Sequence, residues 1–114
     1  MISSKYRFHS RGGVKHTYKD GKTIRQKDLT LVFNENSRGK QRFAVVISKK
    51  ILKTAVGRNQ VRRRLYEAIR LELPNIQKPV DCIFIVYSKD LLNKDFKEIQ
   101  DEIRVLLTKA NIVK

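Results

Sequence analysis

The sequence has few of the residues and patterns that are typical of extracellular, membrane-spanning and zinc-binding proteins. Its 114 residues include one cysteine, two histidines, two prolines and no tryptophan. One cysteine cannot build a disulfide framework, and Cys82 sits in an apolar, strand-like run, where a small buried side chain is its expected role. No apolar run approaches the roughly 20 residues that cross a bilayer, and the N-terminus lacks the apolar centre of a signal peptide. We expect one cytoplasmic domain over residues 1–114, with residues 1–6 flexible.

A recognisable protein active site is also missing. His9 and His16 have no cysteine nearby, so the spacing of a zinc site is absent. The carboxylates form no pair suited to general acid–base or two-metal catalysis. Those near the C-terminus have the pattern of a solvated helix face: Asp95, Glu98, Asp101 and Glu102. We therefore expect neither a catalytic residue nor a metal ligand in this chain.

Acidic residues are scarce relative to basic ones. The chain has 26 Lys and Arg against 11 Asp and Glu, a formal net charge of +15. Residues 1–57 carry 14 basic and 3 acidic residues, whereas residues 79–114 carry 6 of each. Such an imbalance indicates a polyanionic partner, and nucleic acid fits better than an anionic membrane. The binding surface should come from the first two thirds, and the last third should be scaffold.

Hydrophobic periodicity predicts an α+β fold with the order α-β-β-β-α-β-α. The expected elements are a helix over residues 14–20 that ends at Gly21, strands over 23–25, 29–33 and 43–48, a helix over 54–73, a strand over 80–87, and a final helix capped by Asn93 or Asp95. The turn-rich segment 34–40 predicts an antiparallel hairpin between its flanking strands. Strand 80–87 is apolar on both faces except at Asp81, which predicts an interior position. Three helices would then pack on a small, mostly antiparallel sheet.

The helix over residues 54–73 carries two different faces. A core stripe recurs at helical spacing: Val61, Leu65, Ala68 and Ile69. The adjoining arc is basic and polar: Arg58, Asn59, Arg62, Arg63, Tyr66 and Arg70. Thr54 is the expected N-cap, and Pro74 is a stop signal.

The basic arc favours contact with nucleic acid over a merely solvated helix face. Arginine suits this task because its planar fork makes paired hydrogen bonds to phosphate oxygens. Asn59 offers an amide to a 2′-hydroxyl or a base edge, or else satisfies local backbone. The connector just before the helix adds three cations: Lys49, Lys50 and Lys53.

A second surface is suggested between the first helix and the sheet, formed by Val14, Tyr18, Thr30 and Val32. Tyr18 is suited to stacking on an unpaired base, worth roughly 1–3 kcal/mol in single-strand binders. Ordinary packing of a helix on a sheet explains the same residues equally well.

Residues 43–50 (FAVVISKK) and 55–63 (AVGRNQVRR) resemble the strand, the Ser-Lys-Lys turn and the "RNR" signature of the bacterial ribonuclease P protein family. The resemblance implies a ribosomal-protein S5 domain 2-like fold with a left-handed βαβ crossover, opposite to the usual hand. It also implies a protein subunit that helps a catalytic RNA remove the 5′ leader of precursor tRNA. In that family the RNA and the substrate hold the Mg²⁺ ions. The implied partners are ribonuclease P RNA and precursor tRNA, with no membrane and no obligate protein partner.

The same resemblance assigns roles to residues. The catalytic RNA would contact Arg58, Asn59, Arg62, Arg63 and Arg70, together with Lys49, Lys50 and Lys53. Val14, Tyr18, Thr30 and Val32 would line the leader cleft. The chain departs from the family pattern at four positions, where basic or aromatic residues are common: Gln60, Tyr66, Val14 and Val32.

Two rival functions share the charge pattern. A ribosomal-type RNA-binding protein would bind RNA but add nothing to leader removal. A DNA-binding protein that places the arginine helix in a major groove would show sequence-dependent duplex affinity, and the sequence offers no dimerisation element for it.

Overall fold

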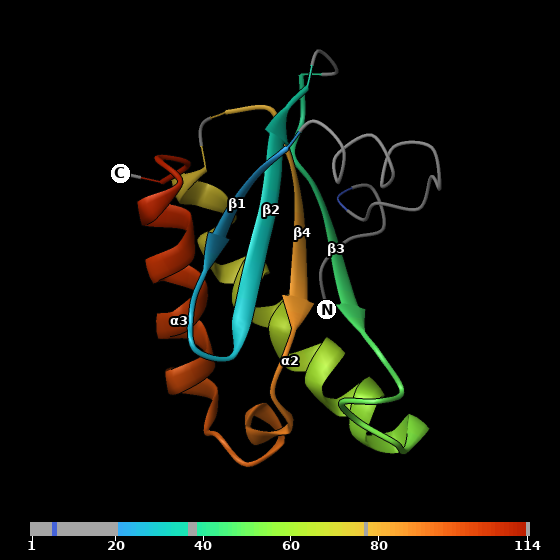
Figure 1. The fold of residues 1–114 in the computed structure, drawn as a ribbon. Helices are drawn as coiled ribbons and strands as arrows, with labels where there is room; N and C mark the ends of the chain where they lie inside the picture. Colours follow the sequence, from blue (N-terminus) through green and yellow to red (C-terminus); the bar gives the residue numbers. More distant parts are fainter. Residues whose placement is uncertain (1–5, 7–20, 37–38, 77, 114) are drawn as a thin grey trace.

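The structure is a computed structural model, and it describes residues 6, 21–36, 39–76 and 78–113. The elements, in chain order, are β1 (Lys22–Arg25), β2 (Leu29–Glu35), β3 (Arg42–Ile47), α2 (Ala55–Glu72), the 3₁₀ turn η2 (Leu73–Asn75), β4 (Val80–Val86), the 3₁₀ turn η3 (Lys89–Leu92) and α3 (Phe96–Lys109) (Figure 1). The predicted α+β class is confirmed. The expected count of three helices is not supported, because the described residues form two α-helices. The helix expected at 14–20 lies outside the described residues.

The sheet has the strand order β1-β2-β4-β3. β2 pairs antiparallel with β4, and β3 pairs parallel with β4. The predicted hairpin between β2 and β3 is therefore wrong, because β4 lies between them. The connection passes the start of β4, where the Asn36 N–H donates to the Pro79 carbonyl at 2.9 Å. A strand that is apolar on both faces buries most area at the centre of the sheet, and β4 takes that place.

β3, α2 and β4 form a βαβ unit between parallel neighbours. In Figure 1 both strands point down, α2 lies behind the sheet and β4 stands to the left of β3. This path is left-handed, as the family resemblance implied, and most such crossovers have the opposite hand.

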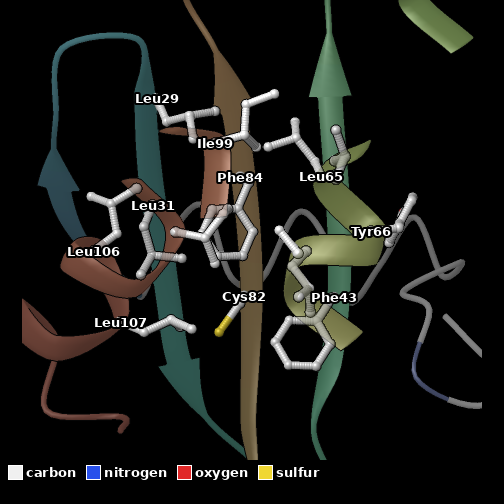
Figure 2. Close-up of a cluster of buried hydrophobic side chains, with 14 of the residues drawn as sticks. Leu29, Leu31, Phe43, Leu65, Tyr66, Cys82, Phe84, Ile99, Leu106 and Leu107 are labelled. Atoms are coloured by element: carbon white, nitrogen blue, oxygen red, sulfur yellow. The ribbon is translucent and has the colours of Figure 1, made fainter. Parts of the chain in front are cut away.

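α2 and α3 pack on the same face of the sheet and enclose the main core. The predicted stripe of α2 is completely buried, and so are Ile99, Ile103, Leu106 and Leu107 of α3. Figure 2 shows Leu65 of α2 and Ile99 of α3 around Phe84 of β4, in one cluster with side chains of β2 and β3. Cys82 belongs to this core, where burial raises the pKa of its thiol. Tyr6 is half-buried against the same cluster.

Helix ends follow the signals in the sequence. The Thr54 hydroxyl accepts the Gly57 N–H at 3.0 Å, and the Asp95 carboxylate accepts the Glu98 N–H at 2.9 Å. Asp95, rather than Asn93, is thus the cap of α3. α3 ends where Asn111 adopts φ 58° and the Ile112 N–H returns to the Leu107 carbonyl at 3.0 Å, a hydrogen-bond pattern that satisfies the last carbonyls. In the described ranges no helix is long and apolar enough to cross a membrane.

The face of the sheet away from the helices holds a smaller cluster. Val32, Ala44 and Ile83 are buried there, with Ile85 packed against them. Alternation along β2 places Thr30 and Val32 on this face and Leu29 and Leu31 in the main core. The alternation of the sequence over residues 29–33 therefore matches the two faces of β2.

Candidate nucleic-acid interface

The connector between β3 and α2 is a tight basic turn. The N–H groups of Ile51 and Leu52 both donate to the Ser48 carbonyl, each at 3.2 Å. Leu52 is buried, so its side chain anchors the turn to the core. The three lysines of the turn are exposed, as predicted: Lys49, Lys50 and Lys53.

Arg58 has a different position from the one expected. Its Nη1 donates to the Leu52 carbonyl at 2.8 Å, and the side chain is half-buried. The guanidinium therefore braces the connector against the first turn of α2. This contact fixes the position of the three lysines relative to the helix.

Asn59, Arg62 and Arg63 follow on the outer side of α2. Arg62 donates from Nη1 to the Asn59 Oδ1 at 3.1 Å, which orients both side chains. Arg63 is exposed, and its side chain forms no ion pair with another described residue. We call this group, with the connector lysines, the basic connector surface: Lys49, Lys50, Lys53, Asn59, Arg62 and Arg63.

The far end of the predicted arc does not continue this surface. Tyr66 is only 7% exposed and belongs to the main core, so its place on the exposed arc was predicted wrongly. Arg70 is exposed, but its guanidinium pairs with Glu67 at 3.0 and 3.1 Å from Nε. The hydrogen bond from Arg70 lowers the pKa of the Glu67 carboxyl.

Arg64 was not among the predicted site residues, and the structure gives it a structural role. Its Nη1 donates to the Leu92 and Lys94 carbonyls at 3.4 and 3.2 Å. These bonds tie α2 to the loop before α3. Its neighbours Arg62 and Arg63 point elsewhere, because successive helix residues are about 100° apart.

The predicted leader cleft is only partly described. Thr30 and Val32 lie together on the helix-free face, at 3% and 5% exposure. Val14 and Tyr18 lie outside the described residues. Beside Thr30 a pocket of about 180 Å³ is lined by Arg25, Gln26 and Tyr87. Tyr87 is 56% exposed; sequence reasoning placed it in an interior strand, since alternation alone does not show where a strand leaves the core.

Carboxylates in the described part of the chain serve the fold. Asp81, Glu72 and Asp28 are each 5% exposed or less, and they pair with Arg42, Arg104 and Lys94 respectively. Glu102 contacts Lys94 and is half-buried, so it does not belong to a solvated helix face as predicted. Over the described ranges no three His, Cys, Asp or Glu side chains gather as a metal site would require.

Comparison with known proteins decides the family. The family model described as Ribonuclease P matches residues 2–111. The chain belongs to the ribonuclease P protein family. The ribonuclease P protein component of Thermoanaerobacter sp. (strain X514) is 35% identical over 96 residues, covering 84% of this chain and 81% of the relative. That of Chloroflexus aurantiacus is 30% identical over 105 residues, covering 92% and 77%.

Solved ribonuclease P proteins share the fold. The Staphylococcus aureus protein has a TM-score of 0.84 at 22% identity, covering 96% of this chain and 98% of that one. The Thermotoga maritima protein has a TM-score of 0.81 at 24% identity, covering 90% and 96%. Family membership supports a role in tRNA processing within the ribonuclease P ribonucleoprotein, with ribonuclease P RNA as the partner.

Proposed function

We propose that this chain binds the catalytic RNA of ribonuclease P and the 5′ leader of precursor tRNA, and so assists the endonucleolytic maturation of the tRNA 5′ end. The RNA subunit performs the phosphodiester hydrolysis, with Mg²⁺ held mainly by that RNA and the substrate. The observation that carries the proposal is the basic connector surface, which lies on the family's signature segments and has no carboxylate partner among the described residues.

The basic connector surface is suited to the phosphates of the catalytic RNA. Arg62 and Arg63 offer planar guanidinium groups for paired hydrogen bonds, and the three lysines add positive charge beside them. Arg58 supports the surface from beneath through the Leu52 carbonyl. Arg70 contributes less, because Glu67 offsets its charge.

The leader belongs, in this proposal, on the helix-free face of the sheet. Val14, Tyr18, Thr30 and Val32 would line its path. Thr30 and Val32 are almost completely buried, so they shape the surface more than they contact RNA directly. Among the described residues, Tyr87 supplies the exposed aromatic ring on this side.

Reconstitution tests the proposal. The purified protein is added to a bacterial ribonuclease P RNA at low Mg²⁺, and cleavage of a precursor tRNA is followed. We expect strong stimulation of cleavage at the mature 5′ end. Arg62→Ala and Arg63→Ala should each weaken assembly and lower the salt slope of RNA binding by about 0.7–0.9. Lys97→Ala, which removes an exposed lysine of α3, is the matched control and should change neither.

Two results would contradict the proposal. Tight RNA binding without stimulation, once a mismatched RNA partner is excluded, would favour a ribosomal-type RNA-binding protein. Unchanged salt slopes in the Arg62 and Arg63 variants would show that this face does not touch phosphate.

A further inference from the structure

The helix-free face of the sheet ends at a small pocket beside Tyr87. Thr30 of β2 lies opposite both Ile85 of β4 and Arg25 of β1, and residues opposite each other in an antiparallel pair share a face. Tyr87 comes two residues after Ile85, so alternation places its ring on the same face. We call this cavity of about 180 Å³ the Tyr87 pocket, and its lining residues are Arg25, Gln26, Thr30 and Tyr87.

The Tyr87 pocket has the size and the chemistry of a site for one nucleobase. Pockets that hold drug-sized ligands measure about 300–1,000 Å³, so a cavity of about 180 Å³ suits a single flat group. Tyr87 is 56% exposed, which leaves ring surface open for stacking. Thr30 adds a hydroxyl that can donate or accept a hydrogen bond. The pocket can therefore stack a base and contact its edge.

Arg25 supplies positive charge at the rim of the Tyr87 pocket. It is exposed and forms no ion pair with another described residue. No carboxylate is among the described residues that line the pocket. The nearby Asp28 carboxylate pairs instead with Lys94. The Arg25 guanidinium is therefore available to a phosphate beside a bound base.

The Tyr87 pocket lies at the end of the sheet where the connector to α2 begins. Ile47 of β3 pairs in parallel with Val86 of β4. The next residues, Ser48 and Tyr87, therefore leave the sheet from neighbouring strands, which are about 4.8 Å apart. Figure 1 shows β3 and β4 ending together at the lower end of the sheet, where the connector departs. RNA on the helix-free face thus passes Tyr87 on its way to the basic connector surface.

Tyr87 also bears on one departure from the family pattern. Val32 stands where an aromatic ring is common, and it lies opposite Ile83 of β4. Tyr87 comes four residues after Ile83, roughly 13 Å farther along the strand at about 3.3 Å per residue. Among the described residues, the exposed ring of this face therefore lies at the connector end and not at the centre.

We propose that the Tyr87 pocket holds one unpaired base of the 5′ leader, stacked on the Tyr87 ring, while Arg25 contacts a neighbouring phosphate. A single-stranded leader suits this site because its bases can turn outward and stack, whereas the bases of helical RNA are already paired. The proposal rests on the proposed function, because it requires the leader to lie on the helix-free face.

The test of stacking uses the reconstituted holoenzyme and precursor tRNAs that each carry one abasic nucleotide in the leader. With the wild-type protein, removal of the base at one position should weaken substrate binding about tenfold. Tyr87→Ala should weaken binding of the intact leader about tenfold and abolish the abasic effect at that position alone. Tyr87→Phe keeps the ring and should behave as wild type. Urea unfolding checks that both variants fold, as expected for an exposed residue.

The test of the phosphate contact uses salt dependence. Arg25→Gln should lower the salt slope of leader-dependent binding by about 0.7, the value for one phosphate of a single strand. Lys97→Gln removes an exposed lysine of α3 outside the pocket and is the charge-matched control. It should leave the slope unchanged, and Tyr87→Ala should do the same.

Other outcomes overturn the proposal in distinguishable ways. An equal loss in Tyr87→Ala for a substrate without a leader would place the ring against another part of the RNA. Equal losses in Tyr87→Phe and Tyr87→Ala would show that the hydroxyl, and not stacking, makes the contact. Unchanged affinity in Tyr87→Ala would show that the pocket binds no base, and an unchanged slope in Arg25→Gln would exclude the phosphate contact. A wild-type protein that fails to stimulate cleavage would instead refute the proposed function itself.

Discussion

Cationic side chains in this protein fall into two groups with different surroundings. Arg42, Lys94 and Arg104 each pair with a carboxylate that is almost completely buried. The cations of the basic connector surface have no such partner among the described residues. The difference lies in the carboxylates, because a buried carboxylate is costly unless it is paired. Each of them recruits a cation to the fold, whereas the cations of the basic connector surface stay available to RNA.

The comparison also shows why net charge alone does not locate an RNA-binding face. Arg62, Arg63 and Arg64 are consecutive, yet Arg64 binds backbone carbonyls of the loop before α3. Arg70 pairs with Glu67 on the same helix. A basic residue contributes to RNA binding only where the fold leaves its charge uncompensated.

Asp81→Ala should have the largest effect on stability. Asp81 accepts both guanidinium hydrogen bonds of Arg42 at 2.8 Å and a third from Asn36 at 2.8 Å. Its loss leaves a largely buried guanidinium without its carboxylate, at a cost of about 3 kcal/mol. Urea unfolding measures the loss, and RNA affinity of the folded protein should stay unchanged. If the free energy of unfolding did not change beyond experimental error, the two groups of cations would not be distinct.

A matched pair of substitutions should separate the groups with smaller effects. Arg104→Gln removes the partner of Glu72 and should lower the free energy of unfolding by less than Asp81→Ala does, since the Arg104 side chain is 56% exposed. Arg63→Gln should leave stability unchanged and weaken RNA binding. Urea unfolding and RNA titration of both variants check this. If both variants lost RNA affinity equally, Arg63, which has no carboxylate partner among the described residues, and Arg104, which pairs with Glu72, would not differ in role.

Glu102→Gln should have the smallest effect, and one that depends on pH. Burial, together with the nearby Asp28 carboxyl, raises the pKa of Glu102 above its ordinary value of 4.5. Ionising Glu102 therefore costs more in the folded protein than in the unfolded chain. This cost is absent below the ordinary pKa and complete above the raised one. The variant should gain stability relative to wild type as pH rises from acid to neutral; a constant difference in urea unfolding would contradict the shift.

The strand faces and both helices of the described chain could be predicted from the sequence, because burial of one face makes apolar residues recur at a regular spacing. The strand that pairs with β3 could not be predicted in this way. Alternation at residues 29–33 and 43–48 shows which side chains face the core, and a turn-rich segment fits either a hairpin or a passage over another strand. The doubly apolar character of β4 was the available clue to its central place.

The candidate site could also be predicted only in part. The exposed lysines of the connector and the outer position of Asn59, Arg62 and Arg63 follow from turn and helix geometry. The contact of Arg58 with the Leu52 carbonyl depends on how the connector folds back, which residue types do not specify.

The place of β3 at the edge of the sheet also bears on how the chain folds during synthesis. Among the described strands β3 pairs with β4 alone, and Arg42 meets Asp81 across 39 positions of sequence. At about 5–20 residues per second, the ribosome adds that length in roughly 2–8 seconds, whereas a helix forms within about a microsecond. α2 can thus form long before β3, the strand that precedes it, has a strand to pair with. We expect the connector that carries Lys49, Lys50 and Lys53 to become ordered late, when β3 pairs with β4 and so completes the sheet.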